Sequence, residues 1–243
     1  MKFYRDWVRP TAISFDLDDT LYDNVPIMIA AETALIDWLA LKCEAFQGMT
    51  MHQWMKQRQG YAALHPEVAH DVTALRLSSL QHAFEQQGYS AQDAASLAVQ
   101  GLNVFLQTRN DFQVPPDNVA LLQRLAQHYP IIAITNGNAR PDNIGLAGIF
   151  DHVLSPKAGE FRMKPYCDLF RHAEQQTGHY GSAWLHVGDH IVSDVVGAIN
   201  AGWQAAWFNE SQLNIPFNKY SEHSVRLPHL EYTHFSDLVD SLT

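Results

Sequence analysis

Short apolar runs bounded by turn residues recur near the start of the chain and through its second half. These runs cover residues 11–17, 129–135, 150–154, 184–187 and 204–208. Runs of this length are typical of strands that are buried on both faces of a parallel sheet. Helical spacing lies between most of them, and one stretch before Gly202 puts four apolar side chains on a single face: Val192, Val195, Val196 and Ile199. The alternation of strand and helix predicts an α/β core.

The interval from about Tyr22 to Asp111 breaks this alternation, because its periodicity is helical and it holds no convincing strand. Apolar positions with helical spacing fall within residues 27–39, 74–84 and 97–105. Gly88 closes one predicted helix, and Ser90 with Asp93 opens the next as a capping box. We therefore expect an all-helical insert after the first strand.

The predicted insert spans residues 22–111 and divides the α/β core into residues 1–21 and 112–243. Pro115 and Pro116 suit a linker followed by the first turn of another helix, which marks the return to the core.

Charge and composition narrow the function classes. The 243 residues include 16 Lys and Arg against 26 Asp and Glu, which gives a formal net charge of −10. Such an acidic chain is a poor candidate for binding nucleic acid or anionic membranes. The two cysteines, Cys43 and Cys167, exclude a disulfide framework and a four-cysteine zinc site. The sequence shows neither a cleavable signal pattern nor a window of membrane-spanning length, so we expect a cytoplasmic monomer or homodimer.

The end of the chain carries less information. Polar residues are scattered from Asn214 to Thr243, and the sequence predicts structure there only weakly and no function.

Two acidic side chains, Asp16 and Asp18, follow the first predicted strand. Open α/β sheets bind ligands at the carboxyl ends of their strands. The alternation of Asp16 and Asp18 lets two carboxylates approach one site, one as a nucleophile and the other for proton transfer. Acidic residues after a strand also form turns or cap helices, and for Asp19 and Thr20 that interpretation stays open.

Uncharged and basic groups follow the next two strands. Thr135 and Asn136 can donate hydrogen bonds to phosphate oxygens without adding charge, and Gly137 supplies flexibility. Lys164 can neutralise a phosphoryl group as a point charge. The alternative interpretations are a plain turn after Thr135 and a surface position for Lys164.

The fourth strand of this series runs into Asp189, and Asp194 follows five residues later. Proteins bind Mg²⁺ through one or two carboxylates together with substrate phosphate and water, so Asp189 and Asp16 suit this ion. Asp194 also suits the start of the following helix, and the two roles are compatible. His186 and His190 are interpreted as packing or lining residues.

The order Asp-x-Asp-x-Thr, Thr-Asn, Lys-Pro and Gly-Asp-x-x-x-x-Asp resembles the haloacid dehalogenase-like hydrolase superfamily. This resemblance implies a Rossmann-like core with a helical cap inserted at the first of the superfamily's two usual positions. The dehalogenase branch usually lacks a carboxylate two residues beyond its nucleophile, so Asp18 favours phosphate esters over haloacids.

The same resemblance implies roles for individual residues. Asp16 would attack phosphorus, while Asp18 would protonate the leaving oxygen and then activate water against the aspartyl phosphate. Thr135 and Lys164 would hold the phosphoryl oxygens. The implied groups around Mg²⁺ are Asp16, the backbone carbonyl of Asp18, Asp189 and, as a direct or a more distant carboxylate, Asp194.

Substrate choice is expected to reside in the predicted cap. Its polar residues among helical apolar positions are His65, His70, Asp71 and Arg76. The predicted substrate-binding set is Thr135, Asn136, Lys164, His70 and Arg76. Each of the cap residues is alternatively a solvated helix residue.

Four segments are similar to the bacterial phosphatases of the riboflavin pathway, which act on flavin mononucleotide and 5-amino-6-(5-phospho-D-ribitylamino)uracil: residues 16–24, 70–73, 134–139 and 186–189. The expected partner is a small phosphorylated metabolite. Three alternatives stay open: a broad phosphatase of sugar phosphates or nucleotides, a phosphomutase that passes the phosphoryl group to a sugar, and a non-catalytic binding module.

Overall fold

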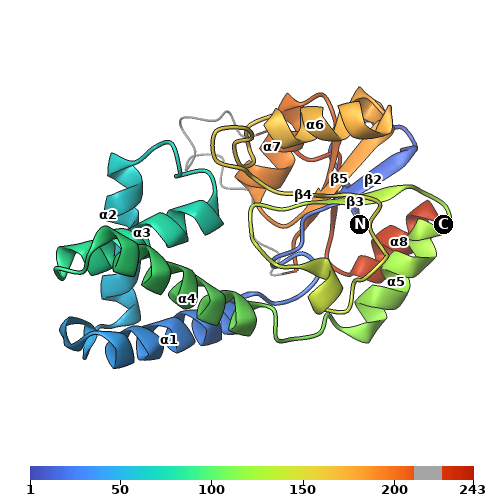
Figure 1. Cartoon of the computed structure of the whole chain (residues 1–243). Helices are drawn as coiled ribbons and strands as arrows, with labels where there is room; N and C mark the ends of the chain where they lie inside the picture. Colours follow the sequence, from blue (N-terminus) through green and yellow to red (C-terminus); the bar gives the residue numbers. More distant parts are fainter. Residues whose placement is uncertain (211–225) are drawn as a thin grey trace.

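The computed structural model of the chain describes residues 1–210 and 226–243. A seven-stranded sheet lies at the centre of one half of this described part, with strand order β1-β7-β6-β5-β2-β3-β4 (Figure 1). The strands are β1 (Lys2–Phe3), β2 (Ala12–Phe15), β3 (Ile131–Ile134), β4 (Val153–Leu154), β5 (Trp184–Gly188), β6 (Gln204–Phe208) and β7 (Leu230–Tyr232). Neighbouring strands are parallel except at the edge, where β1 pairs with β7 antiparallel. The α/β core predicted from the five apolar runs is confirmed.

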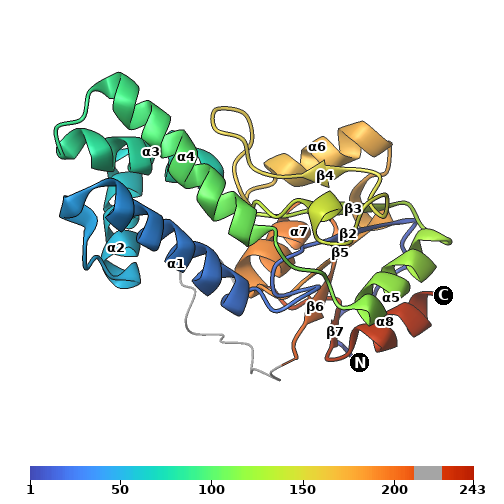
Figure 2. The ribbon, with the colours of Figure 1, turned by 60° about the horizontal axis from the view of Figure 1, so that its bottom comes forward.

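Strand β2 shows how the sheet divides the core into two layers. All of its residues are buried, and alternate side chains face opposite sides. Ile13 and Phe15 belong to a hydrophobic cluster with α5 (Pro116–Ala126) and α8 (Phe235–Leu242), whereas Ala12 belongs to a cluster with α6 (Asp168–Thr177) and α7 (Gly197–Asn200). Figures 1 and 2 show these helix pairs on the two sides of the sheet.

The stretch with helical spacing before Gly202 is helical, but not in one regular form. Residues Ile191–Val196 form a π-helical segment that continues directly into α7. Gly202 follows with a φ of +83°, a left-handed conformation that glycine adopts readily and that ends the helix.

Four helices form the other half of the molecule: α1 (Val25–Lys42), α2 (Met51–Leu64), α3 (Val72–Gln86) and α4 (Ala91–Arg109). They bury a hydrophobic cluster of their own, which includes Leu35, Trp54 and Phe84. Half of the predicted capping box is formed: the Ser90 hydroxyl accepts from the Asp93 N–H, but the Asp93 carboxylate accepts from that hydroxyl rather than from the Ser90 N–H.

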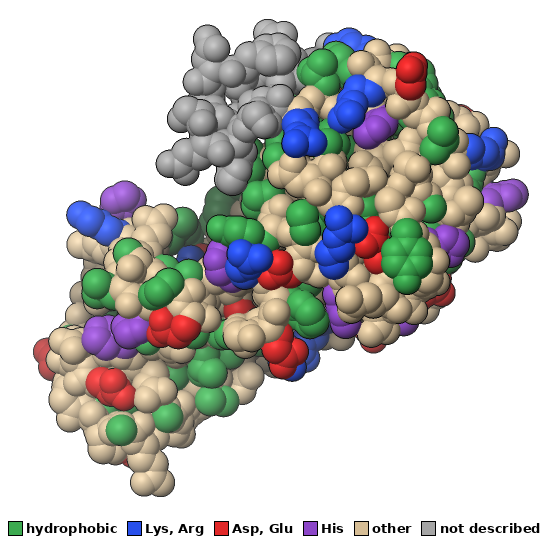
Figure 3. Space-filling view, turned by 90° about the horizontal axis from the view of Figure 1, so that it is seen from above, with side chains coloured by type: hydrophobic (Ala, Val, Ile, Leu, Met, Phe, Trp, Pro, Cys, Tyr) green, Lys and Arg blue, Asp and Glu red, His purple; other side chains and the backbone are tan. Residues whose placement is uncertain are grey.

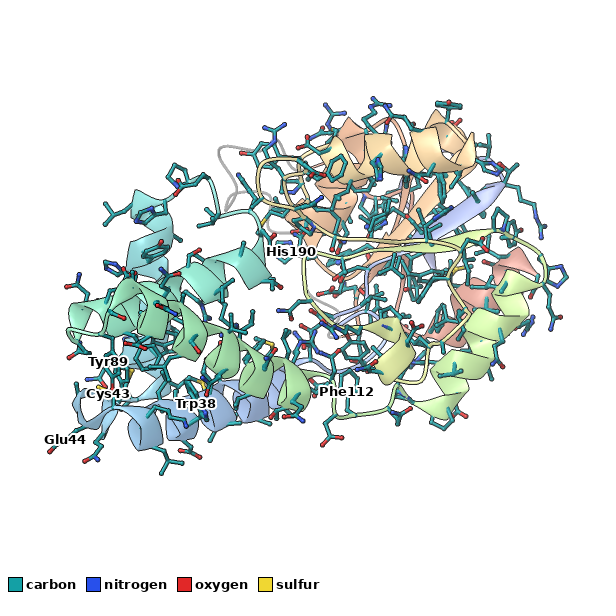
Figure 4. The ribbon with its side chains drawn as sticks, viewed as in Figure 1. Trp38, Cys43, Glu44, Tyr89, Phe112 and His190 are labelled. Carbon is teal, nitrogen blue, oxygen red and sulfur yellow. The ribbon has the colours of Figure 1, made fainter. Side chains whose placement is uncertain are left out.

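Close packing of α1 on α4 depends on Gly101. A Cβ at this position would lie 2.9 Å from the ring of Trp38. In Figure 4, Trp38 lies nearer to the core than Glu44 and Tyr89, which are at the far end of this helical half. The α1 and α3 helices both pack along α4, so α4 is the central element of the four.

Short 3₁₀ helices complete the described elements, at Glu44–Phe46, Pro141–Asn143 and Gly181–Ala183. The weak prediction for the end of the chain is superseded at residues 226–243, where β7 and α8 are formed, while residues 214–225 lie outside the described residues. Among the helices described, none combines the length and apolar character needed to cross a membrane. Figure 3 shows basic side chains scattered among acidic and histidine side chains on one face.

Candidate active site

Polar side chains from five segments meet at the carboxyl end of the central strands. Asp16 follows β2, Thr135 follows β3 and Asp189 follows β5, and β2 lies between the other two strands. Lys164 comes from the loop after β4, and Asp194 comes from the π-helical segment. His190, next to Asp189, lies on the side of the core that faces the four-helix half (Figure 4). The parallel sheet thus brings residues that are far apart in sequence to one edge.

Lys164 is the central cation of this cluster. Its Nζ donates to Asp16 Oδ1 at 2.8 Å, to Asp194 Oδ1 at 2.6 Å and to the carbonyl oxygen of Ile134 at 2.6 Å. Only 1% of the residue is exposed, so the alternative of a surface lysine is wrong. A buried ammonium with two carboxylate partners remains charged, and their charges raise the Lys164 pKa against the lowering that burial causes.

The main chain of Lys164 is held by Asn136. The Asn136 amide nitrogen donates to the Lys164 carbonyl at 2.9 Å, and the Asn136 amide oxygen accepts from the Lys164 N–H at 2.8 Å. Both polar atoms of the Asn136 side-chain amide are therefore bonded to the main chain of the loop that carries the lysine. The sequence placed Asn136 in the predicted substrate-binding set, whereas in the structure its side chain bonds to the Lys164 main chain.

Three carboxylates surround the single lysine. One oxygen each of Asp16, Asp189 and Asp194 lies within 4.8 Å of the others, a spacing that suits a metal ion. Burial raises the pKa of the Asp16 carboxyl well above its ordinary value, although Lys164 opposes the shift. Burial and the Asp194 charge raise the pKa of Asp189 to about 7. The cluster carries more negative charge than Lys164 balances, and hard carboxylate oxygens are the ligands that Mg²⁺ prefers, so the residues fit this ion.

Asp194, the third carboxylate of this cluster, is packed tightly against the end of β5. A Cβ on Gly188 would collide with its carboxylate, so only glycine allows β5 to pass so close. The His190 N–H donates to Asp194 Oδ2 at 2.9 Å. Burial alone raises the Asp194 pKa, but the adjacent Lys164 ammonium and the hydrogen bond from His186 bring it below its ordinary value. Asp194 therefore lies in the first turn of its helix and faces the site as well.

His186 lies one layer below these charges. Its Nδ1 is 2.7 Å from the Ser14 hydroxyl, and its Nε2 is 3.2 Å from Asp194 Oδ1. Burial and the Lys164 charge lower the pKa of His186 to about 4. The side chain is fully buried against Phe170, as the interpretation of a packing residue predicted.

The turn after Asp16 separates the roles of its polar residues. Asp19 adopts a φ of +59° and accepts the Asn24 N–H at 2.8 Å, so it forms the turn. The Thr20 hydroxyl donates to Asp189 Oδ1 at 3.1 Å and thereby orients a carboxylate of the cluster. The open alternative of a turn role is confirmed for both residues, because the Thr20 N–H donates to the Leu17 carbonyl at 3.3 Å, and Thr20 contacts the cluster as well.

Asp18 is held by two donors. Its Oδ1 accepts from the Tyr22 hydroxyl at 2.6 Å and from Nη2 of Arg109, the last residue of α4. Its Oδ2 lies against Gly137, where a Cβ would collide with it. Sequence reasoning missed Tyr22 and Arg109 as members of this site.

A signal for Arg109 is nevertheless present in the sequence. It follows Phe105 by four residues and therefore falls on the apolar face of α4. A charged residue in phase with a buried helix face needs a partner, because an unpaired charge is costly to bury.

A cavity of about 210 Å³ lies between the two halves beside Thr135. Gly137 and Asn138 line it from the core, and Thr73 and Leu106 line it from the helices. The buried Thr135 hydroxyl accepts the Gly137 N–H at 2.9 Å and so shapes the loop at the cavity wall.

The residues predicted in the helical insert are not gathered in one place. Asp71 caps α3, accepting from the N–H groups of Thr73 and Ala74, and its other oxygen accepts the Ala158 N–H of the core at 3.2 Å. His65 pairs with the exposed Glu67 at 3.0 Å.

His70 and Arg76 occupy different surroundings from each other. The His70 ring packs edge-on against the ring of Tyr166 in the core, with ring centroids 5.1 Å apart. Its buried Nδ1 makes no hydrogen bond with the described residues. Arg76 donates to Glu32 at 3.0 Å and lies over the Phe105 ring, so its polar contacts remain inside the insert.

Comparisons with known proteins agree with this geometry. A family model described as haloacid dehalogenase-like hydrolase matches residues 10–202. The chain is 35% identical over 239 residues to the 5-amino-6-(5-phospho-D-ribitylamino)uracil phosphatase YigB of Escherichia coli K12, and the match covers 98% of each chain.

Solved structures share the fold. A 2-haloacid dehalogenase from Pseudomonas syringae pv. tomato DC3000 superposes with a TM-score of 0.85 at 34% identity, covering 96% of this chain and 98% of that one. The putative HAD-hydrolase YfnB of Bacillus subtilis, bound to magnesium, superposes with a TM-score of 0.66 at 20% identity, covering 97% of this chain and 100% of that one. At this identity the similarity is evidence for a shared fold only. Because the family match spans most of the chain and YigB aligns with nearly all of it, this protein belongs to the haloacid dehalogenase-like hydrolases.

Proposed function

We propose that the chain is a magnesium-dependent phosphomonoester hydrolase with Asp16 as its nucleophile. The observation that carries the proposal is that the Asp16 carboxylate accepts from the Lys164 ammonium at 2.8 Å and belongs to one acidic cluster with Asp189 and Asp194. Phosphoryl transfer depends mainly on positioning and charge compensation, and this arrangement offers both.

In the proposed reaction, Asp16 forms a bond to phosphorus as the bond to the leaving oxygen breaks. Asp18 gives its proton to that oxygen, then takes a proton from the water that hydrolyses the aspartyl phosphate. Lys164 and Thr135 hold the phosphoryl oxygens. Asp16, Asp189, Asp194 and the Asp18 carbonyl would hold Mg²⁺, which would supply positive charge to compensate the transferred group.

We assign Asn136 a different role from the one expected from sequence. Its two hydrogen bonds to the Lys164 main chain support a role in holding the lysine rather than in contacting substrate. Likewise, the pairing of Arg76 with Glu32 supports a role inside the insert.

The helical insert, residues 22–111, is proposed to act as a cap over the site. The cavity beside Thr135, lined from both halves, supports this division of the chain. By its similarity to YigB, the substrate is proposed to be 5-amino-6-(5-phospho-D-ribitylamino)uracil or the related alkyl phosphate flavin mononucleotide.

Haloacid hydrolysis is less well supported, although one similar structure is a 2-haloacid dehalogenase. When a carboxylate nucleophile displaces halide, the halide leaves without a proton and no proton donor is needed. In this chain, however, Asp18 stands two residues beyond Asp16, and one of its oxygens faces the loop after Thr135. The second carboxylate therefore favours phosphate esters, whose alkoxide leaving groups require a proton.

The test is phosphate release by the purified chain from flavin mononucleotide, the ribitylaminouracil phosphate, sugar phosphates and nucleotides, with Mg²⁺ or with excess chelator. We expect Mg²⁺-dependent release with the highest kcat/KM for the flavin-pathway esters, and at least about a 10³-fold loss in Asp16→Asn. Release of phosphate at similar rates from many esters would support the proposed phosphatase chemistry but overturn the proposed flavin-pathway substrate. Isomerised sugar phosphate without free phosphate would indicate a mutase, and halide release from 2-chloropropionate would indicate a dehalogenase.

A further inference from the structure

The carboxylate of Asp18 is tied to α4, the central helix of the helical insert, by Arg109. Arg109 ends α4, is fully buried, and forms its ion pair with Asp18 Oδ1. The ion pair joins residues that are 91 positions apart, one in the core and one at the end of the insert's central helix. A change in the position of α4 therefore reaches Asp18 through this contact.

Burying an arginine costs free energy that Asp18 partly offsets. Arg109 Nε and Nη1 are buried and make no hydrogen bond within the described residues. A guanidinium with one carboxylate partner and two unsatisfied nitrogen atoms is a poor way to stabilise a fold. Its position beside Asp18 is better explained by what it does to that carboxylate.

The two oxygens of Asp18 face different surroundings. Oδ1 receives both Arg109 and the Tyr22 hydroxyl, while Oδ2 lies against Gly137 beside Thr135. With Oδ1 occupied by two donors, Oδ2 is the oxygen of Asp18 that is left to exchange a proton. That oxygen is the one on the side of the loop that would hold the phosphoryl group.

The segment that follows Arg109 packs against the turn that carries Asp18 and Tyr22. The ring of Phe112 packs against the ring of Tyr22, with centroids 4.7 Å apart. Figure 4 shows Phe112 where the chain passes from α4 into the core. Arg109 and Phe112 thus contact the Asp18 and Tyr22 pair from one connecting segment.

We propose that Arg109 is a positioning residue that fixes Asp18 Oδ1, directs Oδ2 toward the leaving oxygen, and couples this orientation to the position of the insert. The proposal rests on the phosphatase function proposed above. In the step concerned, the bond from phosphorus to the leaving oxygen breaks, the bond from Asp16 forms, and the proton on Asp18 Oδ2 moves to the leaving oxygen.

The test compares two leaving groups in Arg109→Met and Arg109→Lys. An alkoxide, as from flavin mononucleotide, needs the proton, whereas 4-nitrophenolate leaves without one. The value of kcat/KM reports on steps through formation of the aspartyl phosphate, so hydrolysis of that intermediate does not affect it. We expect Arg109→Met to lower kcat/KM for flavin mononucleotide by about 10²-fold and that for 4-nitrophenyl phosphate by less than about 10-fold. Arg109→Lys should restore part of the loss.

Two further variants separate positioning from folding. Tyr22→Phe removes the other donor to Oδ1 and should change the ratio of the two kcat/KM values in the same direction, by a smaller factor. Arg58→Met removes a cap arginine that pairs with Glu32 at 2.9 Å, and it should leave the ratio at the wild-type value. Thermal unfolding of each variant reports on its folding.

Equal losses for both esters in Arg109→Met and Tyr22→Phe would overturn the proposal, as would a wild-type ratio in both. If Arg109→Met does not fold, Arg109→Lys and Tyr22→Phe still decide. Wild-type protein that releases phosphate from neither ester would instead refute the proposed function itself.

Discussion

Two buried charge clusters, one in the core and one in the helical insert, have opposite imbalances. In the core, Lys164 stands among three carboxylates whose oxygens lie within 4.8 Å of one another. In the insert, the Glu32 carboxylate receives Arg58 at 2.9 Å and Arg76 at 3.0 Å. The first cluster has an excess of negative charge and the second an excess of positive charge.

The difference shows how a cluster that can bind a ligand, here the one in the core, differs from a cluster that holds helices together, here the one in the insert. Two carboxylates of the core follow strand ends and the third, Asp194, comes from the π-helical segment, and their surplus negative charge favours binding of a cation. The insert cluster has one member on each helix, with Glu32 on α1, Arg58 on α2, Arg76 on α3 and Phe105 of α4 beneath the Arg76 guanidinium. Burial, and then the charge of Arg58, lower the pKa of Arg76 to about 10. This second cluster joins the four helices and offers no free carboxylate.

The largest effect is expected from Lys164→Met. The change leaves Asp16 and Asp194 without the cation between them and removes a charge that would hold the phosphoryl group. We expect kcat/KM for phosphate release to fall by about 10³-fold. Lys157→Met is the matched control, because Lys157 lies in the same loop but pairs with exposed Glu160. Equal activity of the Lys164 variant and wild type would show that the core cluster is structural, like the one in the insert.

Glu32→Gln tests the scaffold side of the comparison. The variant keeps the shape of the side chain but leaves two arginines without their carboxylate, one of them almost fully buried. We expect the free energy of unfolding to fall by about 3 kcal/mol, measured by urea denaturation. The ratio of kcat/KM values for alkyl and aryl phosphates should stay that of wild type.

A surface pair provides the control for that experiment. Arg124 on α5 and Asp240 on α8 are 2.8 Å apart, but both side chains are largely exposed. Asp240→Asn should lower the free energy of unfolding by less than about 1 kcal/mol. A loss as large as that of Glu32→Gln would mean that burial is not what distinguishes the insert cluster.

The contrast between the regions also explains which parts of the fold were predictable. The strands β2, β3, β5 and β6 were found because burial on both faces makes each a nearly continuous apolar run, whereas β4 is partly exposed and was found only as the end of a short apolar run. By contrast, β1 has two residues and β7 has three, and the latter buries a glutamate, Glu231, so neither leaves such a run. Among the insert helices, α2 was missed because Trp54 is its buried residue and no apolar stripe follows.

The candidate site divides in the same way. Strand ends are local features of sequence, and the topology of a parallel sheet then brings Asp16, Thr135 and Asp189 together. Pairings across the insert are not local, because Arg76 meets a glutamate 44 positions away and Arg109 meets an aspartate 91 positions away. A sequence shows that an arginine needs a partner but not which acidic residue it will reach.

Added Mg²⁺ should raise the thermal stability of the protein through the core cluster and not through the insert cluster. At about 100 times its dissociation constant, an ion bound only by the folded chain adds about 2.7 kcal/mol, so the Tm should rise by several degrees and return to its starting value with excess chelator. Asp189→Asn should remove most of the rise, whereas Glu32→Gln and Asp151→Asn, which changes an exposed carboxylate, should retain it. A full rise in Asp189→Asn would place the ion elsewhere.

The smallest effect concerns a group that is kept neutral rather than paired. His229 Nδ1 accepts the Ala205 N–H at 3.2 Å, and burial with the charge of Arg5 lowers the His229 pKa to about 4. Between about pH 6.5 and 4 the unfolded chain therefore binds a proton that the folded chain does not, so stability falls as pH falls. In His229→Gln, whose amide oxygen can still accept the hydrogen bond, the fall in Tm across this range should be smaller by only about 2 °C, because the ring is partly exposed and solvent screens its charge. Part of the pH dependence should remain, since buried His186 has a pKa lowered in the same direction. An unchanged slope in His229→Gln would mean that the neutral state of this ring contributes nothing, and that charge burial matters only inside the two clusters.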